Sequence, residues 1–236
     1  MTATVRLDLH IHSRHSVDSR LSFEQIIERI TYQGLQGFAL TDHNTTEGLA
    51  ELGRLRTAYP RFWFIPGVEV STREGHLLAY GVTESPPPGR PLAETLERVA
   101  ALGGVAVLAH PFRWVHGVGR RLAAESRVDG LEGRNGKNSE LANSRADLLA
   151  VRRSIASTGG SDAHEPDRVG RTFTEFPGEV ASVDDLLEQI RKGKTTAAGE
   201  SLSFAGRVRS SVRDGLLSAV RGFRPVGPRP VHPDRF

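Results

Sequence analysis

The chain has 236 residues and contains no cysteine. This absence excludes disulfide bonds and thiolate metal sites, so any bound metal must be held by imidazole and carboxylate groups. The chain also lacks any run near the roughly 20 apolar residues of a membrane span, and its first residues lack the basic start of a signal peptide. We therefore expect a cytoplasmic protein with no membrane partner, in which nine histidines require an explanation.

Lysine is scarce, since only three of the 31 cationic residues are Lys and the others are Arg. Residues 201–236 hold seven Arg and two Asp, a net charge of +5, whereas residues 1–200 hold 24 basic and 26 acidic residues, a net charge of −2. The basic isoelectric point of about 9.7 therefore reflects the tail and does not by itself indicate a nucleic-acid substrate. We expect one catalytic domain over residues 1–200, followed by a basic tail over residues 201–236.

Apolar and polar periodicities predict strands and helices that alternate from residue 5 to about 200. In the first strand, Val5, Leu7, Leu9 and Ile11 are expected on one face and Asp8, His10 and His12 on the other. The strands are expected near residues 5–13, 37–41, 62–70, 76–82, 105–109, 128–132 and 157–160, and the helices near 22–34, 46–58, 91–102, 139–152 and 183–192. This rhythm predicts a mainly parallel α/β sheet, either open or closed into a barrel.

Candidate metal ligands occur where the predicted strands end. His10 and His12 are two residues apart on a strand, so their side chains leave the same face and can share one ion, although a pair of surface histidines is the alternative. Further candidates follow later strands: Asp42, His43, Glu69, His110, Asp162 and His164. Because functional side chains of a (β/α) barrel gather at the carboxyl ends of its strands, these residues are expected to share one mouth.

Each of these positions has its own alternative. Asp42 fits an N-cap for the following helix, so His43 is the favoured ligand of that pair. Glu69 is an isolated carboxylate in a strand that is expected to be buried, and either a metal or a buried salt bridge would compensate its charge. His110 precedes a proline that ends the strand, and Asp162 follows two glycines that let the backbone bend close to an ion.

Five segments, in this order and spacing, resemble the PHP (polymerase and histidinol phosphatase) family: Asp8–Ser13, Thr41–His43, Gly67–Glu69, Ala109–Pro111 and Ser161–His164. The resemblance covers residue 5 to about 200 and is strongest to the small stand-alone phosphoesterases. It implies a distorted seven-stranded (β/α) barrel that binds two or three divalent ions, Mn, Zn or Fe, at the carboxyl ends of its strands.

The resemblance also implies which side chains hold each ion. The first ion would be held by His10, His12, Glu69 and Asp162. The second would be held by Glu69, which bridges, together with His76 and His110. The third would be held by Asp18, His43 and His164, with His15 as a competitor of Asp18. Asp8 is expected to orient one of the histidines from behind.

The function that follows is hydrolysis of a phosphate ester, most directly a phosphomonoester of a small molecule or nucleotide. Attack by a metal-bound hydroxide is expected, without a covalent phosphoenzyme. Glu69, Asp162 and His164 are the candidate catalytic residues, and Asp162 or His164 would accept or return a proton. Arg113 and Arg134 are candidates for binding phosphate oxygens, with a solvated surface role as the alternative for each.

Two other functions stay open at this point. One is a nuclease that acts at 5′ ends, with the basic tail supplying phosphate contacts, and the other is a non-catalytic metal-binding regulatory module. In residues 204–223, Phe204, Val208, Val212, Leu216 and Val220 recur every four positions with Arg mostly off that face. This pattern predicts an amphipathic basic helix that either packs against the barrel wall or contacts nucleic acid or another acidic surface.

Overall fold

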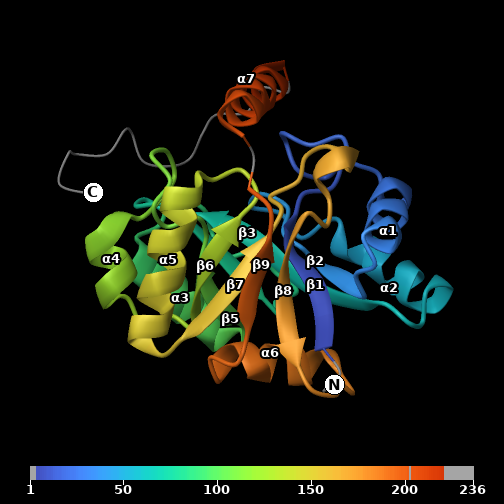
Figure 1. Ribbon diagram of the computed structural model, residues 1–236, viewed down its shortest axis with the longest axis horizontal. Helices are drawn as coiled ribbons and strands as arrows, with labels where there is room; N and C mark the ends of the chain where they lie inside the picture. Colours follow the sequence, from blue (N-terminus) through green and yellow to red (C-terminus); the bar gives the residue numbers. More distant parts are fainter. Residues whose placement is uncertain (1–3, 202, 221–236) are drawn as a thin grey trace.

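Nine strands form one sheet in the order β7-β6-β5-β4-β3-β2-β1-β8-β9 (Figure 1). The computed structural model describes residues 4–201 and 203–220. The strands are β1 (Thr4–Ile11), β2 (Gly37–Leu40), β3 (Trp63–Ser71), β4 (His76–Tyr80), β5 (Val105–Leu108), β6 (Gly130–Asn135), β7 (Ala156–Gly160), β8 (Thr172–Pro177) and β9 (Thr196–Gly199). The helices are α1 (Phe23–Tyr32), α2 (Leu49–Ala58), α3 (Leu92–Ala101), α4 (Gly119–Glu125), α5 (Glu140–Arg153), α6 (Val183–Arg191) and α7 (Phe204–Val220).

The sheet is mixed, so the expectation of mainly parallel strands was wrong. β1 to β3 pair in parallel with one another, as do β5 to β7. β4 is antiparallel to both of its neighbours because β3 turns directly back into it, with Ser71 opposite His76. β8 runs antiparallel to β1 and to β9. The seven expected strands are all present, and β8 and β9 are additional.

The sheet curls until β7 meets β8, which makes a nearly closed barrel. Thr174 of β8 donates from Oγ1 to the carbonyl of Gly159 (2.9 Å), and the Gly159 amide donates back to Thr174 Oγ1 (2.8 Å). Close approach requires glycine here, because a Cβ at position 159 would lie 2.2 Å from the Phe173 carbonyl oxygen. Thr195 Oγ1 donates to the Ser157 carbonyl (2.9 Å). Hydrogen bonds from threonine hydroxyls therefore join β7 to the β8 and β9 segments in place of a regular backbone pairing.

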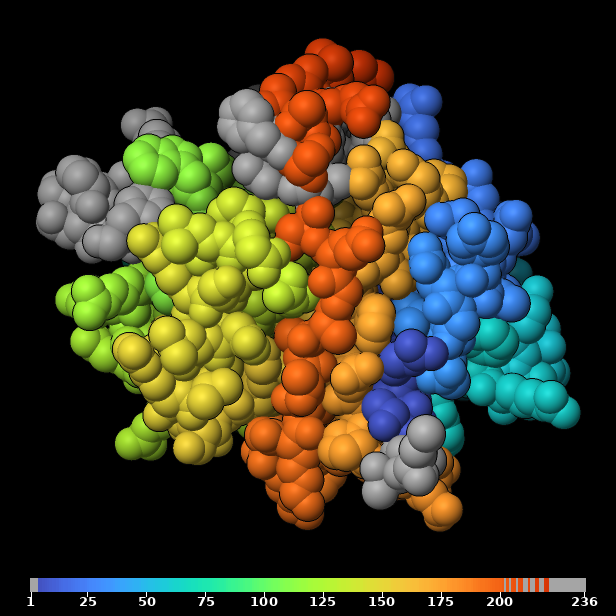
Figure 2. Space-filling model, viewed as in Figure 1, coloured from blue at the N-terminus to red at the C-terminus, as the bar shows by residue number. Residues whose placement is uncertain are grey.

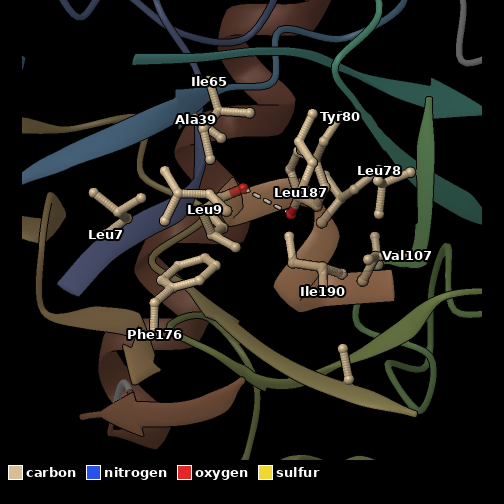
Figure 3. Close-up of a cluster of buried hydrophobic side chains, with 14 residues drawn as sticks. Leu7, Leu9, Ala39, Ile65, Leu78, Tyr80, Val107, Phe176, Leu187 and Ile190 are labelled. Carbon is tan, nitrogen blue, oxygen red and sulfur yellow. Dashed lines mark hydrogen bonds between the residues drawn. The ribbon is translucent and has the colours of Figure 1, made fainter. Parts of the chain in front are cut away.

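One end of the barrel interior is filled by apolar side chains and closed by α6 (Figure 3). Leu186, Leu187 and Ile190 of this helix pack against strand side chains at the end of the barrel where β1, β3 and β5 begin and the antiparallel β4 and β8 end. The strand residues of this core include Leu7, Leu9, Ile65, Leu78, Tyr80, Val105, Val107 and Phe176. Tyr80 satisfies its buried hydroxyl by donating to the Leu9 carbonyl (2.9 Å).

The other helices cover the outside of the barrel. α1 and α2 pack on β1, β2 and β3, and α3, α4 and α5 pack on β3 to β6. The capping box predicted for α1 is present between Ser22 and Gln25. Ile11 belongs to the outer core with α1, and not to the interior core of Leu7 and Leu9, because the pairing of β1 with β2 shifts register between Asp8 and Ile11. The expectation that one face of β1 holds all three side chains was therefore wrong.

α7 forms the predicted C-terminal helix at the end of the barrel where β1 and β7 also end (Figures 1 and 2). Its repeating apolar side chains are exposed, at 49% for Val208, 59% for Val212, 63% for Leu216 and 78% for Val220. These four side chains do not pack against the barrel wall, which was one of the two placements predicted for the helix. The predicted helix extends to residue 223 in the sequence, and residues 221–223 lie outside the described residues, as does the Pro-rich tail. No described helix is long and apolar enough to cross a membrane.

Candidate metal centre

Histidine and carboxylate side chains converge at the end of the barrel opposite α6, where β1, β2, β3, β5 and β7 end and β4 begins. The structure brings together every ligand implied by the sequence: His10, His12, Asp18, His43, Glu69, His76, His110, Asp162 and His164. All are buried or nearly so, and the most accessible side chains are those of Asp18 and His43, at 12% and 11%.

Backbone hydrogen bonds place the last ligands beside the first. The Asp162 amide donates to the His10 carbonyl (2.7 Å), and the His12 amide donates to the Ala163 carbonyl (3.1 Å). Asp162 has a positive φ of 54°, a left-handed conformation that is unfavourable for a residue with a side chain. The bend that this conformation makes directs Asp162 into the cluster just where β7 meets β1.

The first donor group contains the four residues implied for the first ion. The Nε2 atoms of His10 and His12 lie 3.1 Å apart, and both are close to Glu69 Oε2, at 3.2 and 3.3 Å. Asp162 Oδ1 lies 3.4 Å from His12 Nε2 and 3.8 Å from His10 Nε2. Ligands bound 2.0–2.2 Å from a tetrahedral ion lie roughly 3.3 to 3.6 Å from one another, so this spacing fits a single ion.

The second donor group uses the other oxygen of Glu69. Glu69 Oε1 lies 2.9 Å from His76 Nδ1 and 3.0 Å from His110 Nε2. Because Oε2 faces the first group and Oε1 faces the second, the Glu69 carboxylate has the geometry of a bridging ligand. β4 supplies His76 at its first residue, since an antiparallel strand begins at the end where its neighbours finish.

The third donor group centres on Asp18, whose Oδ2 lies 2.8 Å from His164 Nε2 and 3.3 Å from His43 Nε2. His43 Nδ1 is also 3.1 Å from Glu69 Oε2, so His43 lies between this group and the bridging carboxylate. His15, the competitor of Asp18, instead lies 3.2 Å from Glu51 and is 25% exposed, outside the cluster.

The electrostatic environment keeps the carboxylates ionised. Burial by itself would raise the pKa of Glu69, but His43, His10 and His76 outweigh it and hold that pKa well below its ordinary value. Burial opposes ionisation of Asp162 in the same way, and Lys137, His10 and Arg113 hold the pKa of Asp162 well below the ordinary range. Each carboxylate is therefore a charged donor, which is the form that binds a cation.

The histidines differ from one another. Burial lowers the pKa of His10, but Glu132, Glu69 and Asp162 outweigh burial and raise that pKa well above its ordinary value. Burial and Arg113 together hold the pKa of His110 well below its ordinary value, so its imidazole is neutral. His43 Nδ1 is buried 3.1 Å from Glu69 Oε2 but makes no aligned hydrogen bond with it or with any other described residue, an arrangement that a cation would relieve.

Glu132 of β6 orients the first ligand, and sequence reasoning missed it. Its Oε1 lies 2.8 Å from His10 Nδ1, and its Oε2 accepts from the His110 amide (2.7 Å) and from Asn135 Nδ2 (3.0 Å). With Nδ1 committed to Glu132, His10 directs Nε2 into the cluster. A lone carboxylate in a buried strand was the signal that singled out Glu69, and the same signal was present at Glu132.

Asp8 and Asp42 support backbone rather than imidazole rings. Asp8 accepts from the amides of His10 (3.2 Å), Ser161 (2.8 Å) and Gly170 (2.9 Å), and burial raises its pKa to about 6. The expectation that Asp8 orients a histidine ring was therefore wrong. Asp42 accepts from the amide (2.5 Å) and hydroxyl (2.7 Å) of Ser13, while the N-cap position of α2 is occupied by Gly48.

The two arginines expected to bind substrate lie in different places. Arg113 Nη2 is 2.8 Å from Asp162 Oδ2 and 2.6 Å from Asn135 Oδ1, so its guanidinium borders the first donor group. Arg134 instead forms two bonds to the Glu140 carboxylate, at 3.0 and 3.1 Å, and one to the Gly199 carbonyl. The structure does not bring Arg134 to the cluster, because the register of β6 shifts between Glu132 and Arg134, so that Glu132 and Asn135 face the cluster and Arg134 faces away from it.

The barrel and its donor set define a class of protein, a polynuclear metallohydrolase. Imidazole nitrogen and carboxylate oxygen are donors that suit Mn, Zn and Fe. The distances between these donors and the charge of the carboxylates fit bound divalent ions. A family model described as "PHP domain" matches residues 8–113, and one described as "PHP-associated" matches residues 140–195.

Curated relatives agree with these matches. The chain is 30% identical over 196 residues to an uncharacterised protein of Methanocaldococcus jannaschii, covering 77% of this chain and 75% of the relative. It is 39% identical over 102 residues to a phosphoribosyl 1,2-cyclic phosphate 1,2-diphosphodiesterase of Eggerthella lenta, covering 39% of this chain and 37% of the relative. It is 38% identical over 87 residues to a 3′,5′-nucleoside bisphosphate phosphatase of Chromobacterium violaceum, covering 34% and 29%.

Among solved structures, PsfC from Pseudomonas syringae PB-5123 has the same fold, with a TM-score of 0.67 at 19% identity over 93% of this chain and 99% of that chain. The chain belongs to the PHP domain family. Within that family it is a metal-dependent phosphoesterase, with buried groups of His, Asp and Glu side chains that could hold more than one ion.

Proposed function

We propose that this phosphoesterase hydrolyses a phosphomonoester of a small molecule or a nucleotide. The observation that carries the proposal is the sharing of Glu69, whose two oxygens serve two adjacent donor groups while a third group lies beside them. Adjacent divalent ions, when bound, activate water, polarise a phosphoryl oxygen and neutralise charge on the leaving oxygen.

The protein's own residues supply binding and orientation. Glu69 and Asp162 hold the ion positions, and Glu132 fixes the direction of the His10 ring. Arg113, anchored by Asp162 and Asn135, places a guanidinium beside the first group, where it binds a phosphoryl oxygen. His164 Nδ1 lies 3.0 Å from the Asp162 carbonyl and 2.9 Å from Lys137 Nζ, and this histidine is the candidate for passing a proton while its Nε2 is not bound to an ion.

Two relatives support phosphate-ester substrates, because one is named for a nucleoside bisphosphate and the other for a cyclic phosphate of a sugar. Each matches only part of its own length to this chain, so the substrate here is part of the proposal.

The experiment is metal analysis of the purified protein, followed by assays with added Mn on phosphomonoesters, phosphodiesters and 5′-phosphorylated oligonucleotides. We expect more than one divalent ion per chain and phosphate release from small monoesters. A fully metal-loaded protein that released nothing from any of these esters would overturn the proposal.

A further inference from the structure

Lys137 lies at the metal centre, although its position two residues beyond β6 gave no sequence signal for a role. Its Nζ lies 2.9 Å from His164 Nδ1 and 3.4 Å from Asp162 Oδ1, and its side chain is only 15% exposed. By contrast, Lys192 at the end of α6 is 56% exposed and pairs with Glu188. Lysine is almost never this buried without a specific partner, so the position of Lys137 needs an account.

Lys137 and Arg113 approach the same carboxylate through different oxygens. Asp162 Oδ2 accepts from Arg113 Nη2 (2.8 Å) and from Asn135 Nδ2 (3.2 Å). Asp162 Oδ1 faces His12 Nε2 (3.4 Å) and Lys137 Nζ (3.4 Å). Oδ1 is therefore the oxygen directed to the first donor group. Lys137 contacts this oxygen, whereas Arg113 contacts the other oxygen of the same carboxylate.

The charges of the cluster indicate what these two cations are for. Four carboxylates border it, from Asp18, Glu69, Glu132 and Asp162. Lys137 and Arg113 add two cationic side chains beside the Asp162 carboxylate. A phosphomonoester carries close to two negative charges at neutral pH, whereas a phosphodiester carries one. Two cationic side chains at one edge of the site therefore favour the monoester over the diester.

We propose that Lys137 binds a phosphoryl oxygen of the substrate and, together with Arg113, makes the site selective for phosphomonoester dianions over phosphodiester monoanions. This inference rests on the proposed function and specifies its substrate class. An ammonium group has three donors on a flexible stem, so Lys137 can keep its contact with Asp162 while it binds a phosphoryl oxygen. Arg113, held by three side chains, is the fixed member of the pair.

The test compares Lys137→Met, which removes the charge and keeps the length, with Lys137→Arg and with Lys192→Met as the matched surface control. The substrates are p-nitrophenyl phosphate and bis-p-nitrophenyl phosphate, which share a leaving group and differ in charge. Binding of inorganic phosphate to the Mn-loaded proteins is measured by calorimetry, and metal content is measured in parallel.

In Lys137→Met we expect unchanged metal content, weaker phosphate binding and a kcat/KM for the monoester lower by about 10- to 100-fold, the range for one lost charge-assisted hydrogen bond. The diester should lose less than about threefold, because Arg113 still balances one charge. Lys137→Arg should recover most of the monoester activity, and Lys192→Met should match the wild type.

Equal losses on the two esters, unchanged phosphate binding, or loss of metal in proportion to activity would each overturn the inference. The last of these would mean that Lys137 only holds Asp162 and His164 in place. Phosphate binding that depends on Lys137 in a metal-loaded protein that hydrolyses neither ester would support the dianion site and would count against the proposed function instead.

Discussion

The barrel interior changes character along the length of the same strands. β1 gives Leu7 and Leu9 to the apolar core under α6 and then His10 and His12 to the donor cluster. β3 gives Ile65 to that core and then Glu69 to the cluster. One end of the barrel is thus packed with apolar side chains, whose burial is favourable. The other end buries His, Asp and Glu side chains, whose burial is unfavourable unless they are paired.

This difference separates stability from chemistry within one sheet. Burial of apolar side chains at one end stabilises the folded state. Burial of charges at the other end destabilises it, and nearby opposite charges compensate this cost. Substitutions at the two ends should therefore have separable effects. A residue at the donor end should change metal content and activity, and a residue at the apolar end should change the free energy of unfolding.

The largest effect is expected for Glu69→Ala. Because Glu69 faces all three donor groups, its loss should remove metal and lower kcat by roughly 1000-fold. Metal analysis and steady-state kinetics on a monoester measure both quantities. Glu69→Gln is the matched variant that keeps the shape and removes the charge, and it should bind metal poorly as well. Wild-type turnover in Glu69→Ala would rule out the proposal that Glu69 is a ligand shared by two ions.

Leu187→Ala tests the opposite end. Leu187 is 4% exposed in the interior core, so truncation should lower the free energy of unfolding by about 2 to 4 kcal/mol. Denaturant unfolding measures this change. Metal content and kcat of the folded protein should stay within about twofold of the wild type, since the residue is remote from every donor. A loss of metal in this variant would show that the two ends are not separable.

Glu132→Gln should produce an intermediate effect. Gln keeps the size of the side chain but weakens the bond to His10 Nδ1, so metal affinity should fall by about 10- to 100-fold. A competition titration with a chelator measures the affinity. Glu140→Gln, which alters an exposed carboxylate on α5, is the matched control and should behave as the wild type. Equal metal affinities in the two variants would mean that Glu132 does not affect metal binding by the first donor group.

The smallest effect is expected for Arg134→Ala. Its partner Glu140 is 61% exposed, so loss of this ion pair should cost less than about 1 kcal/mol of stability. The KM for a monoester should not change, whereas Arg113→Ala should raise it. A KM in Arg134→Ala that rose as much as in Arg113→Ala would mean that the arginine turns into the site when substrate binds.

Most of the donor end could be read from the sequence because ligand-type residues recur at strand ends. His10, His43, Glu69 and His110 each follow or lie in an apolar run, Asp162 follows two glycines at a strand end, and barrel geometry gathers such positions. β8 and β9 could not be found in this way, since Thr172–Pro177 and Thr196–Gly199 lack a clear apolar alternation. These two strands form because they pair with each other and with β1, and a local sequence pattern holds no information on such pairing.

Other features depend on contacts between distant segments. Ile11 changes core because of a register shift between β1 and β2, and Lys137 gains its position only when the segments after β6 and β7 come together. Arg134 and Arg113 look equivalent in an Arg-rich sequence, and only the direction in which each strand or loop presents its side chain distinguishes them.

The backbone bonds that join Asp162 to His10 and His12 to Ala163 have a consequence for folding. The first donor group unites residues about 150 positions apart, and contacts of such sequence separation carry a large loop-closure entropy and form slowly. A growing chain that has released His10, His12 and Glu69 still lacks the fourth donor until residue 162 has emerged. Binding of an ion by all four donors of this group would therefore occur only after the end of β7 has reached β1, and it would stabilise a late step of folding.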